Sequence, residues 1–329
     1  MLHQNVESLQ DARAPGTIAD YLSIMRLDHA IKHVFIIPGI ALALLLRADH
    51  SVLSVAGVVL TLLSCVLSAS ANYVINEWLD ASFDAHHPSK SSRPCVARRL
   101  SGTIVIIEYV VLAALSLICA GAVAPLVTGT TVALLLSGLI YNVPPLRSKD
   151  HVFVDVLSES INNPIRMIFG WAMVDPTSLP PGSVLLAYWM GGAFLMNTKR
   201  LAEFREVTSK VGLSKLHEYR RSFRHYTEER LLLAGFLYAQ ISLVGLAVFM
   251  VKYRIEYLLA IPLLAALFCL YLHIGLKPQS TAQAPERLFG EHQLMLAVGL
   301  VALGFLILTF VDVPPLHGLV EAHYISIKW

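Results

Sequence analysis

Residues 51–94 read SVLSVAGVVLTLLSCVLSASANYVINEWLDASFDAHHPSKSSRP, and this stretch combines a long apolar run with an abrupt polar end. Residues 51–74 carry no charged side chain and exceed the roughly 18 residues that a helix needs to cross a bilayer. Asn76, Asp80 and Asp84 then follow at intervals of four, and the cations Lys90 and Arg93 come next. The stretch predicts a membrane-spanning helix that ends in a polar segment with candidate functional residues.

Apolar runs of the same kind recur along the whole chain. Of its 329 residues, 56% are hydrophobic and only 15% are charged, whereas a soluble protein carries about 25% charged residues. We therefore predict an all-α integral membrane protein with nine transmembrane helices. The expected spans are 29–47, 51–74, 103–121, 123–141, 152–174, 183–198, 231–251, 255–275 and 292–312.

The distribution of lysine and arginine predicts the orientation of these spans. With nine spans, 20 of the 25 basic residues fall on the side of the N-terminus, 4 fall on the other side, and Arg166 lies within a span. Cytoplasmic loops are enriched in basic residues, so the N-terminus is expected in the cytoplasm. Residues 1–20 are predicted to be a polar tail, 21–315 a single transmembrane domain, and 316–329 a short C-terminal tail. No nucleic-acid partner is expected.

The spacing of Asn76, Asp80 and Asp84 predicts a metal site. If the helix continues to about Asp84, four-residue steps leave these side chains on one face, with a drift of only about 40° per step. Carboxylate and amide oxygens are the ligands that Mg²⁺ prefers, usually alongside phosphate groups. The alternative is that both aspartates belong to an ordinary solvated loop, where Lys90 and Arg93 anchor the helix on the cytoplasmic side.

The His-Pro pair at residues 87–88 is expected to end the helix, because proline disfavours helical geometry in the residue before it. Lys90 and Arg93 would then fold back over whatever the metal holds. A metal together with lysine and arginine is a typical arrangement for holding a pyrophosphate leaving group.

The N-x-x-x-D-x-x-x-D pattern between the second and third of nine spans resembles the first aspartate-rich motif of the UbiA superfamily of intramembrane prenyltransferases. Typical aromatic prenyltransferases of that superfamily carry a second D-x-x-x-D motif after the sixth span, where this chain reads NTKRLAEFRE. Five stretches resemble the decaprenyl-phosphate phosphoribosyltransferase branch of the superfamily. They are NTKRLAEFRE itself, the D-x-x-H-P-x-K-x-x-R-P tail of the first motif, HAIKH, YTEE and APERLF. One departure is Glu77, because an aspartate typically follows the motif's asparagine.

The resemblance implies a UbiA-type helix bundle and a set of substrate-binding residues. Lys199 and Arg200 would contact donor phosphates, with Glu203 orienting them, and Arg147 follows the fourth span in a loop that resembles the superfamily's tyrosine-containing loop. Lys32 is either a ligand for the acceptor phosphate or a lysine that snorkels to the interface. Arg166 lies within a span, where a buried arginine indicates a site, unless it pairs with Asn162 or another residue of the bundle.

The predicted reaction moves a phosphoribosyl group from phosphoribosyl pyrophosphate to a polyprenyl phosphate and releases pyrophosphate. The expected cofactor is Mg²⁺ on Asp80, Asp84 and Asn76. The expected location is the bacterial inner (plasma) membrane, with the active site facing the cytoplasm. One alternative is a prenyltransferase that joins a polyprenyl diphosphate to an aromatic or other small acceptor. Another is a non-enzymatic lipid transporter or lipid-binding protein, although no internal repeat is visible.

Overall fold

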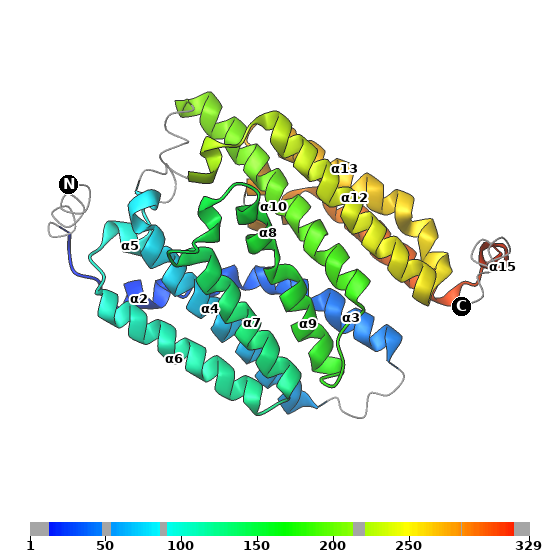
Figure 1. The fold of residues 1–329 in the computed structure, drawn as a ribbon, viewed down its shortest axis with the longest axis horizontal. Helices are drawn as coiled ribbons and strands as arrows, with labels where there is room; N and C mark the ends of the chain where they lie inside the picture. Colours follow the sequence, from blue (N-terminus) through cyan, green and yellow to red (C-terminus); the bar gives the residue numbers. More distant parts are fainter. Residues whose placement is uncertain (1–12, 48–53, 86–90, 213–220, 284, 319–329) are drawn as a thin grey trace. The chain divides into compact units, whose positions relative to one another are not determined.

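The computed structural model describes residues 13–47, 54–85, 91–212, 221–283 and 285–318 (Figure 1). In these ranges the chain is helical, and its only β-type pairing is an isolated bridge between Pro15 and Arg99. Backbone contacts divide the chain into two compact units, residues 1–180 with 204–228 and residues 181–203 with 229–329. The all-α class is confirmed, whereas a single domain over 21–315 stays a prediction.

The first unit contains the polar motif and most of the chain. In order, its elements are α2 (Ile18–Ile24), η1 (Leu27–Ile36), α3 (Ile37–Leu46), α4 (Val55–Asp84), α5 (Pro94–Ala97), α6 (Gly102–Gly121), α7 (Pro125–Asn142), η2 (Ser148–Asp150), α8 (Val154–Ser160), α9 (Asn162–Val174) and η3 (Arg221–Arg224). Helix α10 (Gly182–Val211) belongs to the second unit up to Glu203 and to the first from Phe204.

Helix α4 is the central element of the first unit. It begins after Ser54, whose hydroxyl accepts a hydrogen bond from the backbone N–H of Gly57 at 2.9 Å and so caps the first turn. It continues to Asp84, the last residue of the predicted motif, and it packs against α6, α7 and α9 (Figure 1). The His-Pro pair expected to end it lies outside the described residues. The polar motif therefore lies on the last turns of a helix that is held on several sides.

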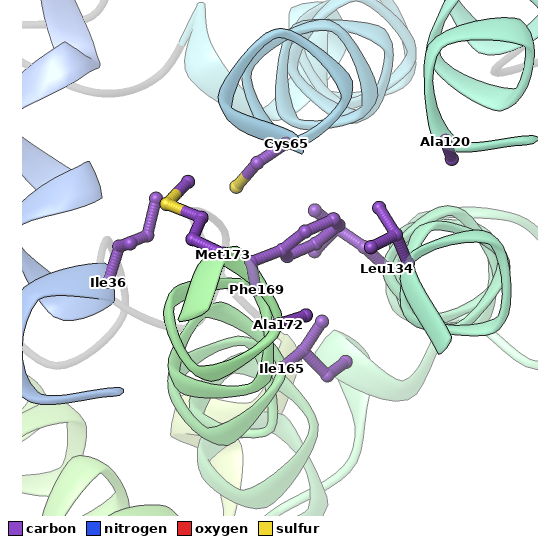
Figure 2. Packing of buried hydrophobic residues seen from close by; sticks show 9 residues of the cluster. Ile36, Cys65, Ala120, Leu134, Ile165, Phe169, Ala172 and Met173 are labelled. Atoms are coloured by element: carbon purple, nitrogen blue, oxygen red, sulfur yellow. The ribbon is translucent and has the colours of Figure 1, made fainter. Parts of the chain in front are cut away.

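Two glycines allow α9 to approach η1 and α3 closely. A Cβ atom at Gly39 would collide with the backbone carbonyl of Met167, and one at Gly170 would collide with the carbonyl of Ile36. Around this contact, the Phe169 side chain is fully buried against Cys65 of α4 and Leu134 of α7 (Figure 2). This packing fixes α9 beside α4.

Within the described residues, six helices are long and apolar enough to cross a membrane, whereas nine spans are predicted. The six are α4, α6, α7, α12 (Glu228–Tyr253), Ile255–Leu276 and α14 (His292–Phe310). The predicted span 152–174 is broken at Ile161 into α8 and α9, because the ring of Pro164 excludes the carbonyl four residues earlier from a regular helix. Nine spans and a cytoplasmic N-terminus stay predictions.

The second unit is also helical. Besides α10 and α12 it contains η4 (Ile255–Ala260), α13 (Ile261–Leu276), η5 (Thr281–Gln283), η6 (Pro285–Gly290), α14 and α15 (Pro314–His317). Polar side chains join α12 to α10: Ser242 donates to the carbonyl of Ala187 at 2.8 Å, and Asn197 donates to the carbonyl of Leu231 at 2.6 Å. These bonds fix the helix that carries the second predicted motif.

Asp175 forms a polar clasp at the end of α9. Its carboxylate accepts bonds from the backbone N–H of Thr177 at 2.9 Å and from the hydroxyls of Thr177 and Ser178, and it pairs with Arg47 at 2.7 Å. Burial alone would raise the pKa of Asp175, but these hydrogen bonds and the Arg47 guanidinium outweigh it and lower the pKa to about 2. The clasp therefore joins the end of α3 to the end of α9.

We expect Asp175→Asn to lower the free energy of unfolding by about 1–3 kcal/mol at pH 7, because it removes a buried charged acceptor from four donors. A lowered pKa means that the stabilisation is present above the usual aspartate pKa of about 4 and is lost as pH falls towards 2. Melting temperatures of both proteins, measured from pH 7 downwards, should therefore converge in that window. The exposed Asp28 provides the control substitution Asp28→Asn, and an Asp175→Asn protein as stable as wild type at pH 7 would contradict the role of the clasp.

Candidate functional site

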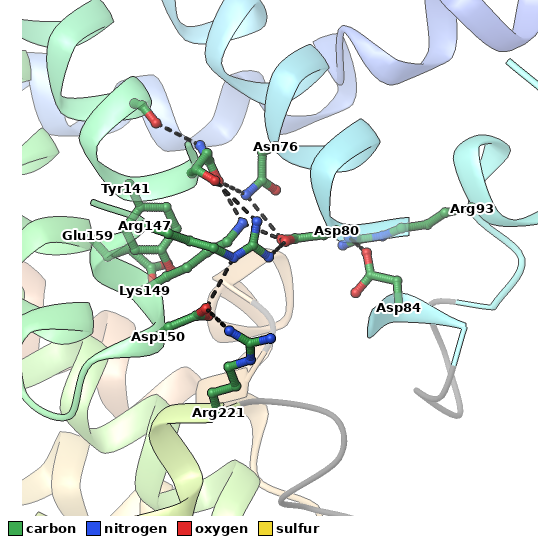
Figure 3. Close-up of polar contacts among 12 residues, drawn as sticks. Asn76, Asp80, Asp84, Arg93, Tyr141, Arg147, Lys149, Asp150, Glu159 and Arg221 are labelled. Carbon is green, nitrogen blue, oxygen red and sulfur yellow. Dashed lines mark hydrogen bonds and ion pairs between the residues drawn. The ribbon is translucent and has the colours of Figure 1, made fainter. Parts of the chain in front are cut away.

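The last turns of α4 present Asn76, Asp80 and Asp84 at successive helical turns (Figure 3). The amide of Asn76 donates to Asp80 Oδ2 at 3.2 Å, which places these two side chains on one face, as their spacing predicts. The Asp84 side chain is 5% exposed and that of Asp80 is 19% exposed. Such burial of carboxylates requires counter-charges close by.

Two cations from the segment after α7 hold Asp80. Arg147 contacts Asp80 Oδ1 through a terminal guanidinium nitrogen at 2.7 Å, and the Lys149 ammonium contacts the same oxygen (Figure 3). Both side chains are themselves largely buried, at 11% and 6% exposure. The predicted site residue Arg147 thus lies at the motif, and Lys149 lies there with it.

Asp84 has its own cation. The Arg93 guanidinium contacts Asp84 Oδ2, and Arg93 is the N-cap residue of the short helix α5. Arg93 therefore lies beside the motif, and its predicted contact with a bound donor stays a prediction. Lys90 lies outside the described residues, as does the side chain of Lys32.

A second layer of charge surrounds Arg147. Asp150 forms an ion pair with Arg147, at 3.3 Å from its Nε, and accepts a hydrogen bond from Arg221 at 3.5 Å. Both guanidinium groups lie over the Phe83 ring, at 5.0 and 5.8 Å from its centre. Cation–π contacts of this kind add to the ion pairs. Sequence reasoning did not assign Asp150, Arg221 or Phe83 to the site, because no spacing rule links residues so far apart in the chain.

Asn142, the last residue of α7, contacts three residues of the site. Its side-chain oxygen accepts bonds from the amide of Asn76 and from Lys149 at 2.7 Å, while its backbone carbonyl accepts from Arg147 at 3.1 Å. Its own amide donates to the carbonyl of Gly138 at 2.9 Å, and the residue is 2% exposed. The only sequence signal for it is its position five residues before Arg147.

Other acidic residues near the motif have different partners. Glu77, one residue after Asn76, is turned away from its face and pairs with Arg26 at 3.3 Å. Asp155 is fully buried and accepts bonds from Ser222 at 3.2 Å and from the hydroxyl of Tyr226. Asp155 thus holds the segment around η3 against the start of α8, which is a structural role.

Arg166 of α9 is 7% exposed, and its Nε atom has no hydrogen-bond partner among the described residues. The side chain of Asn162, its proposed partner, accepts from Ser137 at 2.9 Å and donates to the carbonyl of Glu159 at 3.0 Å. A buried, incompletely bonded guanidinium within a membrane bundle is costly. It therefore stays a candidate ligand for an anion.

Lys199, Arg200 and Glu203 lie on α10 in the second unit. Arg200 is 2% exposed and contacts Glu203 at 3.4 Å, one helical turn away. This motif therefore presents an internal cation–carboxylate pair where two carboxylates would be needed for a second metal. Its approach to the α4 motif stays a prediction.

The oxygen ligands on α4 fit Mg²⁺. Within the described ranges, no three or more His, Cys, Asp or Glu side chains group in a way that could hold a metal. Mg²⁺ usually takes only one or two carboxylates and completes its shell with water and phosphate oxygens. Asp80, Asp84 and the amide oxygen of Asn76 therefore suit a metal that is bound together with a phosphorylated ligand.

Comparison with known proteins places this fold and motif in one family. The profile of the UbiA prenyltransferase family matches residues 35–296. A UbiA homologue from Archaeoglobus fulgidus bound to DMAPP and Mg²⁺ is similar in structure, with a TM-score of 0.65, 19% identity, and coverage of 89% of this chain and 100% of that one. The same homologue bound to GPP and Mg²⁺ gives a TM-score of 0.65 at 20% identity, covering 88% and 99%.

A structure of digeranylgeranylglyceryl phosphate synthase is also similar, with a TM-score of 0.60, 14% identity, and coverage of 89% of this chain and 98% of that one. No curated protein sequence matches the chain. The family profile covers most of the chain, including the aspartate motif on α4 and the basic motif on α10. The chain belongs to the UbiA prenyltransferase family and is a membrane transferase.

Proposed function

We propose that this transferase moves a phosphoribosyl group from phosphoribosyl pyrophosphate to a polyprenyl phosphate and releases pyrophosphate. The observation that carries the proposal is the balance of charge at the two motifs. On α4, two carboxylates meet the three cations Arg93, Arg147 and Lys149. On α10, a cation–carboxylate pair stands where a second metal would need two acids. A donor with three phosphate groups and an anionic acceptor require this excess of cations.

In the proposed reaction, Asp80 and Asp84, with Asn76 assisting, would hold Mg²⁺, which supplies charge neutralisation to the pyrophosphate leaving group. Arg93, Lys90, Arg147 and Lys149 would bind donor phosphate oxygens, and Lys199 and Arg200 would do the same from α10, with Glu203 orienting Arg200. Lys32 and Arg166 would be the ligands for the remaining phosphates.

The bond between the ribose anomeric carbon and the pyrophosphate oxygen breaks, and its electron pair leaves with pyrophosphate. An oxygen of the polyprenyl phosphate then forms the new bond to that carbon. Because the acceptor oxygen is already an anion, no strong general base is needed. The cations around Asp80 stabilise the developing charge of the leaving group.

A prenyl donor is the second candidate, because the structurally similar homologue binds DMAPP and GPP with Mg²⁺. A prenyl diphosphate carries one diphosphate group and no further phosphate, so it would leave part of the cation set without a ligand. The active site would face the cytoplasm of a bacterial inner membrane in both readings, since the loops that follow the second and sixth predicted spans lie on the side with most of the basic residues.

The two donors are distinguished by following pyrophosphate release from purified full-length protein with Mg²⁺. We expect release from phosphoribosyl pyrophosphate only when polyprenyl phosphate is added, with the lipid product carrying the phosphoribosyl group. Turnover of a prenyl diphosphate with an aromatic acceptor, and none with phosphoribosyl pyrophosphate, would establish the second candidate instead.

Asp80→Asn should lower the rate of transfer by about a hundredfold or more, because the variant loses a ligand of the metal that would neutralise the charge developing on the pyrophosphate leaving group. Expression should change little, but the melting temperature should fall, because Arg147 and Lys149 lose the carboxylate that they share. Initial rates at saturating donor, compared per amount of folded protein, provide the measurement. Glu206→Gln is a matched control, since Glu206 pairs with Lys210 on the surface of α10, and it should stay within about twofold of wild type. Near-normal transfer by Asp80→Asn would refute the metal assignment.

Arg147→Gln should have opposite effects on the affinity for the metal and on the affinity for pyrophosphate. Arg147 and a metal compete for Asp80, so removing the guanidinium should strengthen binding of Mn²⁺, as a Mg²⁺ probe, by about fivefold to tenfold in the absence of donor. The same variant should bind pyrophosphate with Mg²⁺ more weakly. Calorimetry measures both affinities, and Arg47→Gln provides a control for loss of a cation elsewhere. Weaker metal binding by Arg147→Gln without donor would contradict the competition.

A further inference from the structure

We infer that Asn142 is the positioning residue of the pyrophosphate subsite. One amide oxygen, buried at the end of α7, accepts from the amide of Asn76 on α4 and from the ammonium of Lys149 on η2. The backbone carbonyl of the same residue accepts from Arg147. A single residue thus connects the metal motif to both cations that contact Asp80. The inference rests on the proposed function only in assigning this subsite to a diphosphate group.

The orientation of the Asn142 amide is fixed by its other bond. Its nitrogen donates to the carbonyl of Gly138, one turn earlier in α7, so its oxygen must face Asn76 and Lys149. Asn142 is 2% exposed, which removes water as a competing donor to that oxygen. Lys149 is likewise buried and needs acceptors on more than one side of its ammonium group. Asn142 supplies a neutral acceptor and Asp80 a charged one.

The charged acceptor and the neutral acceptor of Lys149 would behave differently when a donor binds. If a donor and its metal engaged Asp80, Lys149 would give up this carboxylate and could turn towards a phosphate oxygen. Asn142 is neutral and does not compete with the metal, so it continues to hold the ammonium in place during this exchange. It holds Asn76 in the same way, beside Asp80. Without Asn142, Lys149 would have to be ordered by the donor itself, and affinity would fall.

The test uses the full chain in detergent and Mg²⁺ with inorganic pyrophosphate as the probe. Asn142→Ala should weaken calorimetric binding of pyrophosphate by about tenfold to a hundredfold, the range for a lost hydrogen bond to a charged group. Asn72→Ala is the matched control, because Asn72 also donates a hydrogen bond across helices, to the carbonyl of Leu134 at 2.8 Å, but contacts neither cation. We expect it to bind pyrophosphate within about twofold of wild type, with a similar decrease in melting temperature.

A double-mutant cycle separates positioning from a general loss of packing. If Asn142 acts through Lys149, adding Asn142→Ala to Lys149→Met should cost much less than it costs in the wild-type protein. Equal losses in Asn142→Ala and Asn72→Ala, or fully additive effects of Asn142→Ala and Lys149→Met, would overturn the inference. Pyrophosphate is common to phosphoribosyl and prenyl donors, so these outcomes do not depend on which donor the enzyme uses, and an error in donor class would leave the result for Asn142 intact.

Discussion

The contact of Asp80 with Arg147 and Lys149 is the interaction on which the rest of the site depends. A carboxylate at the end of a membrane helix is costly unless cations lie beside it, and here two of them reach the same oxygen. The neighbouring residues hold the two cations in position for that contact. Asn142 and Asp150 hold the two cations, Phe83 lies beneath Arg147, and Arg221 ties the segment before α12 to the same cluster.

On the proposed function, this arrangement would let one site bind both metal and phosphate. Without a ligand, the cations neutralise the carboxylates and keep α4, α7 and α5 together. With a metal and a diphosphate present, the same cations can transfer to phosphate oxygens while the carboxylates turn to the metal, so the number of paired charges is kept. Metal and donor should therefore bind with positive coupling. The metal alone would leave the cations without a carboxylate, and the donor alone would leave the carboxylates without a cation, so each ligand supplies the partner that the other displaces.

Much of the fold and part of the site could be predicted from the sequence. The apolar run and the four-residue spacing were sufficient to predict that α4 continues to Asp84 with Asn76 and Asp80 on one face, because helical geometry is local. The roles of Asn142, Asp150 and Arg221 could not be predicted, since they arise from contacts between segments up to about 70 residues apart. The break between α8 and α9 was also missed, although Pro164 signals it, because the apolar pattern continues through both helices.

The proposed donor can be tested by observing which oxygen atoms Arg147 and Lys149 contact when it is bound. The most direct measurement is a structure of the protein with Mg²⁺ and phosphoribosyl pyrophosphate. We predict that Arg147 and Lys149 leave Asp80 for oxygens of the pyrophosphate, and that Asp80 and Asp84 contact the metal. A donor bound elsewhere, with both contacts to Asp80 intact, would contradict this prediction.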